Sequence, residues 1–273
     1  MGVLGLKLLL APSLVVAASL AGRRWGPQLA GWVAGFPIIA GPISLFFALE
    51  NGQAFGARAA QGTLTGIVSM SAYAVTYAWA ARHWHWAPAL LGGYAAFAVS
   101  TVTLRNLDFR DVMPHLAMAA VATATGLRLL PELRPAYRLP GGAKGDLPLR
   151  VIATAALVLL VTGMAAGLGP TLSGMLAPFP VAGTVLVVFA HREHGPEAAV
   201  RVLKGFLTAL FAFASFFAVL GFTLETWSIP LAFGTALAVA ALVQGLAVAV
   251  TMWSSRRGPR RVAGSEQPGP RPT

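Results

Sequence analysis

Two glutamates in this chain each follow an apolar stretch and precede an arginine by eight positions. They are Glu50 with Arg58 and Glu193 with Arg201. A carboxylate at the C-terminal end of a helix opposes the helix dipole, so each glutamate is expected to need a positive partner. Two interpretations follow. Each pair is an ion pair that closes an interhelical turn, or each glutamate is a gating or proton-linked carboxylate at the mouth of a membrane pathway.

A Phe-Pro pair lies upstream of each glutamate, Phe36-Pro37 in the first case and Phe179-Pro180 in the second. Proline inside a helix removes one backbone hydrogen bond and clashes with the preceding turn. Within a lipid bilayer the freed carbonyls need a neighbour, water or a ligand. Interrupted helices at matching positions of two repeats indicate a binding site near the membrane midplane. The alternative is that the prolines only kink helices for packing.

Other reactive side chains give weaker signals. His191 and His194 flank Glu193, but their spacing is not that of a zinc-binding His-Glu-x-x-His motif. Tyr73 and Tyr77 put two hydroxyls on one helical face. The chain has no cysteine, P-loop, nucleophile elbow or paired-aspartate motif. We therefore predict no catalytic residue, no metal site and no cofactor, and we do not expect an enzyme.

Both sets of residues recur because the sequence contains an internal repeat. A shift of 143 positions places Gly26-Pro27 on Gly169-Pro170. The same shift aligns the two Phe-Pro pairs, the two glutamates and the two arginines without a gap. A match of glycine, proline, phenylalanine and charged residues in one register indicates a duplicated unit.

Composition indicates that the duplicated unit lies in a membrane. Hydrophobic residues make up 56% of the chain and charged residues 11%, where soluble domains have about 25% charged residues. Runs without charge are long enough to cross a hydrocarbon core: 25–49, 59–81, 151–190, 205–224 and 226–255. We predict an all-α, polytopic membrane protein with the lipid bilayer as its partner. The net charge of +11 is read as a topology signal, not as nucleic-acid binding.

Each unit is predicted to contain four helices. The first unit is 1–104, with helices near 3–22, 27–49, 59–81 and 86–104, and the second is 150–254, with helices near 150–168, 171–190, 200–221 and 228–252. Residues 105–149 connect the units, and the basic segment 255–273 is expected to be a disordered tail.

The connector decides the topology, since its apolar stretch 112–130, which contains His115, is marginal for a membrane span. If it crosses, there are nine helices and the two units are inverted; if it does not, there are eight and they are parallel. Basic residues occupy the first interhelix loop of unit one, as Arg23-Arg24, but the second loop of unit two, as Arg192, Arg201 and Lys204. Orientation follows such Lys/Arg asymmetry. We therefore favour nine helices, with the N-terminus outside and the tail in the cytoplasm.

Each unit resembles the GlpM-like family of small four-helix bacterial inner-membrane proteins. The resemblance rests on Lys7, Arg23-Arg24, Ala30-Gly31, Phe36-Pro37, Glu50, Gly52, Gly62, Ser69, Tyr73 and Pro88 to Leu91. The second unit keeps Arg150, Gly174, Phe179, Pro180, Glu193, Gly195 and Gly205, but has Ala212 for Ser69 and Phe216 for Tyr73. The resemblance implies the bacterial cytoplasmic membrane and a link to exopolysaccharide (alginate) production.

The expected function is that of a permease or flippase-like transporter with its site between the two Phe-Pro helices. Phe36, Pro37, Phe179 and Pro180 would form the site, and Glu50, Arg58, Glu193 and Arg201 would gate it or orient a substrate. The expected substrate is a small anion, a lipid-linked molecule such as a sugar-linked lipid, or a proton-coupled metabolite. The alternative is a non-transporting scaffold or assembly factor for envelope polysaccharide machinery, with membrane-protein partners or a second copy of itself.

Overall fold

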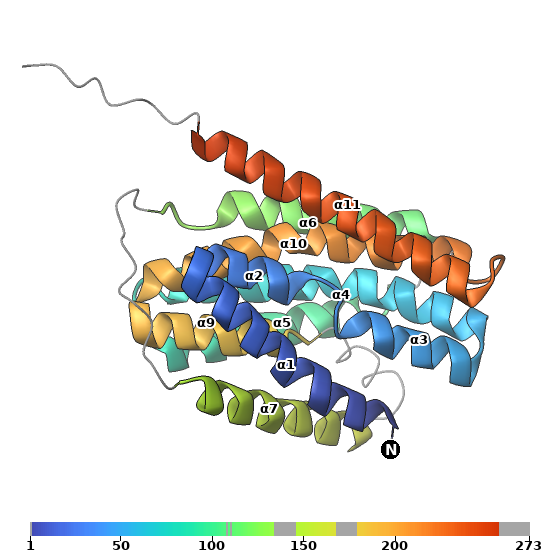
Figure 1. The fold of residues 1–273 in the computed structure, drawn as a ribbon, viewed down its shortest axis with the longest axis horizontal. Coiled ribbons are helices and arrows are strands. Elements are labelled where there is room, and N and C mark those ends of the chain that lie inside the picture. Colours follow the sequence, from blue (N-terminus) through green and yellow to red (C-terminus); the bar gives the residue numbers. More distant parts are fainter. Residues whose placement is uncertain (1, 108, 110, 134–145, 168–178, 257–273) are drawn as a thin grey trace, which may run out of the picture.

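The computed structural model describes residues 2–107, 109, 111–133, 146–167 and 179–256. Helices make up nearly all of these residues, and no strand occurs among them (Figure 1). The helices are α1 (Gly2–Trp25), α2 (Pro27–Gly35), α3 (Ala40–Asn51), α4 (Gln53–Ala80), α5 (Trp86–Leu104), α6 (Val112–Leu129), α7 (Leu147–Gly167), α9 (Val181–His194), α10 (Pro196–Thr223) and α11 (Ile229–Arg256). The all-α prediction is confirmed.

The helices lie lengthwise beside one another, with α10 at the centre of the bundle (Figure 1). In its most apolar window 72% of α10 is buried, against 11% of α11. An apolar helix with so little of its surface covered by protein suits contact with lipid. The tail 257–273 lies outside the described residues.

Four helical stretches of the described chain are long and apolar enough to cross a membrane. They are Pro27–Asn51, Trp86–Leu104, Pro196–Thr223 and Ile229–Val250. This is fewer than the nine spans expected from the sequence. The remaining helices fall short because they are too short in their described part or carry more polar side chains, as α4 does with its serines and threonines.

The second predicted helix is two helices. We expected one kinked helix over 27–49, but α2 ends at Gly35 and α3 begins at Ala40. Phe36 adopts an extended conformation with ψ 147°, which is the conformation that a following proline favours. The interruption is therefore a full break. In the second unit, α9 begins directly after Pro180, and the first part of predicted helix 171–190, with Gly174, lies outside the described residues.

Equivalent glycines turn the chain before α4 and α10. Gly52 has φ +87° and Gly195 has φ +80°, a left-handed region that favours glycine over other residues. The turns are short, so α4 begins at Gln53 and α10 at Pro196. The third helix of unit one thus starts six residues before the predicted position 59, and Arg58 lies inside it.

The connector helix runs beside α4 in the same direction. Hydrogen bonds join Thr65 to His115, Trp79 to Leu129 and Arg82 to Glu132, each across fifty positions. The 18 residues of α6 extend about 27 Å at 1.5 Å per residue. The predicted connector helix 112–130 is thus present, and it follows most of the length of α4.

The first helices of the two units run in opposite directions. Arg23 near the end of α1 contacts Asp146 just before α7, and Ser19, one turn back in α1, accepts a hydrogen bond from Arg150, one turn into α7. The contacting residue numbers decrease along α1 while they increase along α7, so the two helices are antiparallel. Accordingly, α1 begins at one end of the bundle and α11 finishes at the other (Figure 1).

Helices α2 and α10 touch backbone to backbone. A Cβ atom at Gly31 would lie 2.0 Å from the carbonyl oxygen of Val202, and one at Gly205 would lie 1.9 Å from the carbonyl oxygen of Gln28. Small residues allow such close approach of membrane helices. Gly31 and Gly205 therefore fix the position of α2, and with it the Phe36-Pro37 break, against the central helix.

Candidate functional site

Helix α9 carries two of the buried polar side chains of the bundle, Thr184 and His191. It begins directly after Pro180 and has two polar faces, one toward α4 and one toward α1 and α7. The face toward α4 presents Thr184 and His191, which lie seven residues apart and so share one side of the helix.

Two tyrosine hydroxyls from α4 meet this face. Thr184 Oγ1 donates a hydrogen bond to the Tyr73 hydroxyl oxygen at 3.2 Å, and the Tyr77 hydroxyl lies 3.3 Å from His191 Nδ1. Both tyrosines are fully buried. A buried hydroxyl is costly unless it is hydrogen-bonded, so each pairing holds α9 in register against α4. Tyr73 and Tyr77 thus find partners on a neighbouring helix.

Phe179 lies among aromatic side chains of α5. Its ring centroid is 5.0 Å from that of Tyr94 and 5.3 Å from that of Phe97, and Tyr94 in turn stacks on Tyr73. Aromatic pairs at such distances stabilise beyond their area of contact. Pro180 is buried beside this cluster.

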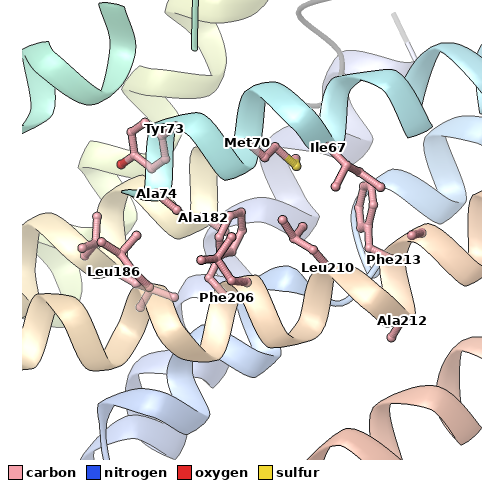
Figure 2. Close-up of a cluster of buried hydrophobic side chains, with 14 of the residues drawn as sticks. Ile67, Met70, Tyr73, Ala74, Ala182, Leu186, Phe206, Leu210, Ala212 and Phe213 are labelled. Atoms are coloured by element: carbon pink, nitrogen blue, oxygen red, sulfur yellow. The ribbon is translucent and has the colours of Figure 1, made fainter. Parts of the chain in front are cut away.

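The Phe36-Pro37 break has different surroundings. Pro37 is buried and Phe36 is half-buried against the core. A Cβ atom at Gly35 would lie 3.5 Å from the Phe206 ring, and one at Gly183 would lie 3.1 Å from the same ring. Phe206 of α10 therefore lies between the end of α2 and the start of α9, where the sequence had placed the site. In Figure 2 Phe206, Leu210 and Phe213 of α10 pack with Tyr73 and Met70 of α4 and with Ala182 and Leu186 of α9.

The second face of α9 joins an ion cluster centred on Arg150. The guanidinium of Arg150 donates to Asp146 at 2.6 Å and to Glu193 at 2.9 Å. It also lies over the Phe189 ring, and the distance from Arg150 Cζ to the centroid of that ring is 4.7 Å. Arg23 contacts the same Asp146. The cluster balances two arginines with two carboxylates and links α1, α7 and α9.

The ion cluster corrects two expectations. Glu193 pairs with the guanidinium of Arg150 and not with that of Arg201, which is half-buried on α10. Glu50 and Arg58 are both exposed, and no ion pair joins them in the part of the chain that is described. The reason is that α4 begins at Gln53, so Arg58 is more than a turn into the helix and not beside the turn that Glu50 ends.

Two histidines complete the polar interior. His115 is buried, its Nδ1 lies 2.7 Å from Thr65 Oγ1 and its Nε2 lies 3.3 Å from the carbonyl oxygen of Phe109. His191 lies beyond the charge-free run 151–190. His191 of α9 is buried, and its Nδ1 lies 3.3 Å from the Tyr77 hydroxyl. No group of three or more His, Asp or Glu side chains is placed to hold a metal within the described residues.

Sequence reasoning missed the central arginine. Arg150 was visible only as the counterpart of Lys7 under the 143-position shift. Asp146 and Ser19 gave no signal, because nothing local shows that the end of α1 lies against the start of α7. The repeat did not point to Thr184 either, because the equivalent position in the first unit is Gly41, which has no polar side chain.

No protein-family model, no curated protein and no solved structure matches this chain.

Proposed function

We propose that the chain is a permease or flippase-like transporter of the bacterial cytoplasmic membrane, built from two units of opposite orientation. One observation carries the proposal. Thr184 on α9 contacts Tyr73 on α4, and Gly41 on α3 contacts the Phe216 ring on α10, where a Cβ atom would lie 3.3 Å from Cζ. The 143-position shift converts one contact into the other, as expected for two units that exchange equivalent helices around a pseudo-twofold axis.

The arrangement of the connector supports this topology. Since α6 runs beside α4 in the same direction, and α1 and α7 are antiparallel, the second unit starts from the end of the bundle opposite to the first. In this proposal α2 and α3 cross as one interrupted span, and α6 crosses as the ninth, so that the N-terminus and the tail lie on different sides.

The distribution of basic residues supports a cytoplasmic location for one end. We call it the basic end; it contains the Arg150 cluster, the α4–α5 turn and the α9–α10 turn, at the left in Figure 1. Its described basic residues include Arg23, Arg24, Arg82, Arg128, Arg150, Arg192, Arg201 and Lys204, whereas the opposite end has Lys7, Arg58 and Arg105. Loops rich in Lys and Arg stay in the cytoplasm, so the tail is proposed to be cytoplasmic.

In this proposal the Arg150–Glu193 pair closes the basic end. The repeat assigns Lys7 and Glu50 as its counterparts at the other end, and Glu50 is exposed there. Phe206 fills the space between the two broken helices. A small anionic or lipid-linked substrate passes only when Phe206 moves and one ion pair opens, which corresponds to alternating access by movement of one unit against the other.

The position of Phe206 also favours a second candidate, the non-transporting scaffold. An aromatic ring between the two Phe-Pro helices, together with backbone contact between α2 and α10, suits a permanently closed bundle. In this candidate the exposed apolar faces of α5 and α11 serve lipid or partner proteins.

Cysteine labelling distinguishes the two functions, because the natural chain contains no cysteine. Ala182→Cys places a thiol near Phe206, and Ala240→Cys places a similarly buried thiol between α10 and α11 as the matched control. A membrane-impermeant maleimide is added to sealed vesicles of either orientation. A permease exposes the thiol at position 182 to both faces over time, while the thiol at position 240 stays unreactive. A folded protein whose thiol at position 182 reacts from neither face contradicts the permease and leaves the scaffold.

A further inference from the structure

Helix α4 carries a hydroxyl at every fourth position over much of its length. Thr65, Ser69, Tyr73 and Tyr77 form this row, which we call the hydroxyl row. Residues four apart lie on neighbouring turns of one helical face. Because four residues exceed one turn by about 40°, the row winds slowly around α4 and meets different helices along its course.

Each hydroxyl in the row bonds to a side chain of another helix. Thr65 pairs with His115 of α6 at 2.7 Å. Ser69 accepts from Thr101 of α5 at 2.9 Å and donates to Ser100 at 3.3 Å. Tyr73 accepts from Thr184, and Tyr77 pairs with His191, both on α9.

Packing alone does not require these interhelical bonds for the serine and threonine of the row, whereas a buried tyrosine hydroxyl lies too far from its own backbone to be satisfied locally. Ser71 and Thr63 on the same helix bond to the backbone carbonyl four residues earlier, at 2.9 Å in both cases. This local bond satisfies a serine or threonine hydroxyl without any partner helix. Thr65 makes a longer bond of this kind to Gln61, at 3.4 Å, in addition to its bond to His115. The row therefore differs from the other α4 hydroxyls in reaching across to α5, α6 and α9.

The row lies inside the bundle and ends in a histidine on each side. Ser69, Tyr73 and Tyr77 are at most 1% exposed, His115 is 4% exposed and His191 is 7% exposed. His115 lies just after the α5–α6 connection, at the end opposite to the basic end, and His191 lies next to the α9–α10 turn. From Thr65 to Tyr77 the row extends about 18 Å along α4, which is more than half of a hydrocarbon core of about 30 Å.

This arrangement suits a proton better than a molecule. A hydroxyl accepts a hydrogen bond and donates one, and a neutral imidazole has one nitrogen of each kind. The row has no charged side chain, and apart from half-buried Thr65 its members have almost no exposed surface. Relay of a proton by single waters between these groups needs far less open volume than passage of a substrate.

We propose that the hydroxyl row is a proton path between His115 and His191. A proton that reaches His115 is bound on a ring nitrogen. Each following group then accepts a proton on a lone pair and releases its own to the next, and His191 releases one at the basic end. Reorientation of the hydroxyls resets the row, so no group is consumed. Successive hydroxyls are about 6 Å apart along α4, which is too far for direct transfer, so the proposed path requires one water to enter each interval. The path rests on the proposed crossing of the membrane by α4 and is independent of the substrate.

Proton flux into proteoliposomes tests the path. The full chain is reconstituted into vesicles that contain a pH-sensitive dye, and a potassium gradient with valinomycin supplies the voltage. Wild-type protein is expected to acidify the vesicles at least tenfold faster than vesicles without protein. Tyr73→Phe, which removes one oxygen and keeps the ring, is expected to return the rate to that of empty vesicles, and Tyr77→Phe and His191→Gln are expected to do the same.

Ser71→Ala is the matched control, since it removes a buried hydroxyl from the same helix but outside the row. It is expected to conduct as the wild type does. Unchanged flux in Tyr73→Phe and His191→Gln, or wild-type flux equal to that of empty vesicles, overturns the path. If the thiol of Ala182→Cys still reacts from both faces in that case, the permease stands without the path. If that thiol reacts from neither face while Tyr73→Phe abolishes flux, the path stands without the permease.

Discussion

Arg150 shows how one side chain can hold three helices together. Its guanidinium bonds to Ser19, Asp146 and Glu193 while it covers the Phe189 ring. The side chain is only 9% exposed. Removing one member of such a buried pair leaves an uncompensated charge, which costs about 3–5 kcal/mol.

We therefore expect Arg150→Met to lower the thermal unfolding midpoint of the detergent-solubilised protein by several degrees. The double variant Arg150→Met/Glu193→Met should recover most of the loss, because it removes both charges. Thermal unfolding followed by circular dichroism measures both effects. A loss in the double variant equal to the sum of the losses in Arg150→Met and Glu193→Met alone would show that the coupling between the two residues is negligible.

Gly205 and Gly62 occupy equivalent positions of the repeat but have different surroundings. A Cβ atom at Gly205 would collide with the carbonyl of Gln28, whereas nothing lies within 4 Å of one at Gly62. Glycine within a helix is normally less stable than alanine by about 0.5–1 kcal/mol.

Gly205→Ala is therefore expected to destabilise the protein strongly, because α2 must move away from α10. Gly62→Ala is expected to be neutral or slightly stabilising, and it serves as the control. The comparison of unfolding midpoints checks both, and similar effects of the two substitutions would contradict the close approach of α2 and α10.

At the scale of elements, the sequence predicted helices better than the contacts between them. Trp86–Leu104 was predicted with the observed bounds, and 112–130 differs from α6 by one residue, since apolar runs between clear turn signals fix both. The break after Gly35 was underestimated as a kink. The extended conformation that proline imposes on Phe36 is the signal that would have found it.

Partners of the candidate site residues were harder to predict than the residues themselves. A pairing of Glu50 with Arg58 was inferred from closeness in sequence, and the start of α4 at Gln53 removes it. The partner of Glu193 is Arg150, which lies in a different helix and 43 positions away in the sequence. Such a contact depends on how α7 and α9 pack against each other, and the sequence pattern around either residue does not predict it.

The connector helix gives a direct test of topology. Since α6 accompanies α4 along its length, reporter fusions placed before and after it, at Asp108 and at Lys144, should report opposite sides of the membrane. Alkaline phosphatase and fluorescent-protein fusions measure this. The same side for both would mean eight spans and parallel units.

At the scale of the whole molecule, the proposed arrangement of two inverted units relates its two ends by pseudo-symmetry. The Arg150–Glu193 pair is formed at the basic end, and the repeat gives Lys7 and Glu50 as its counterpart. If the two units exchange conformations, opening one end should close the other.

We expect a Lys7→Cys/Glu50→Cys variant to cross-link more efficiently when the Arg150–Glu193 pair is also removed by Glu193→Gln. A short bifunctional thiol reagent and a mobility shift on a gel measure this, in a chain that has no natural cysteine. The pair Lys7→Cys/Arg192→Cys, whose second position is exposed at the basic end, controls for nonspecific reaction. Equal cross-linking with and without Glu193→Gln would show that the two ends are not coupled.

Thr184 with Tyr73 and Gly41 with Phe216 are equivalent contacts that no longer have the same chemistry: one is a hydrogen bond between hydroxyls and the other a glycine against a ring. In a symmetric dimer of identical chains, every substitution appears at both places. Joining two copies in one chain removes that constraint, because each position can change while its twin stays as it was. A chain built from two units, as proposed here, can therefore keep polar chemistry in one half of its interior and use the matching half for packing alone, which a homodimer of a single unit could not do.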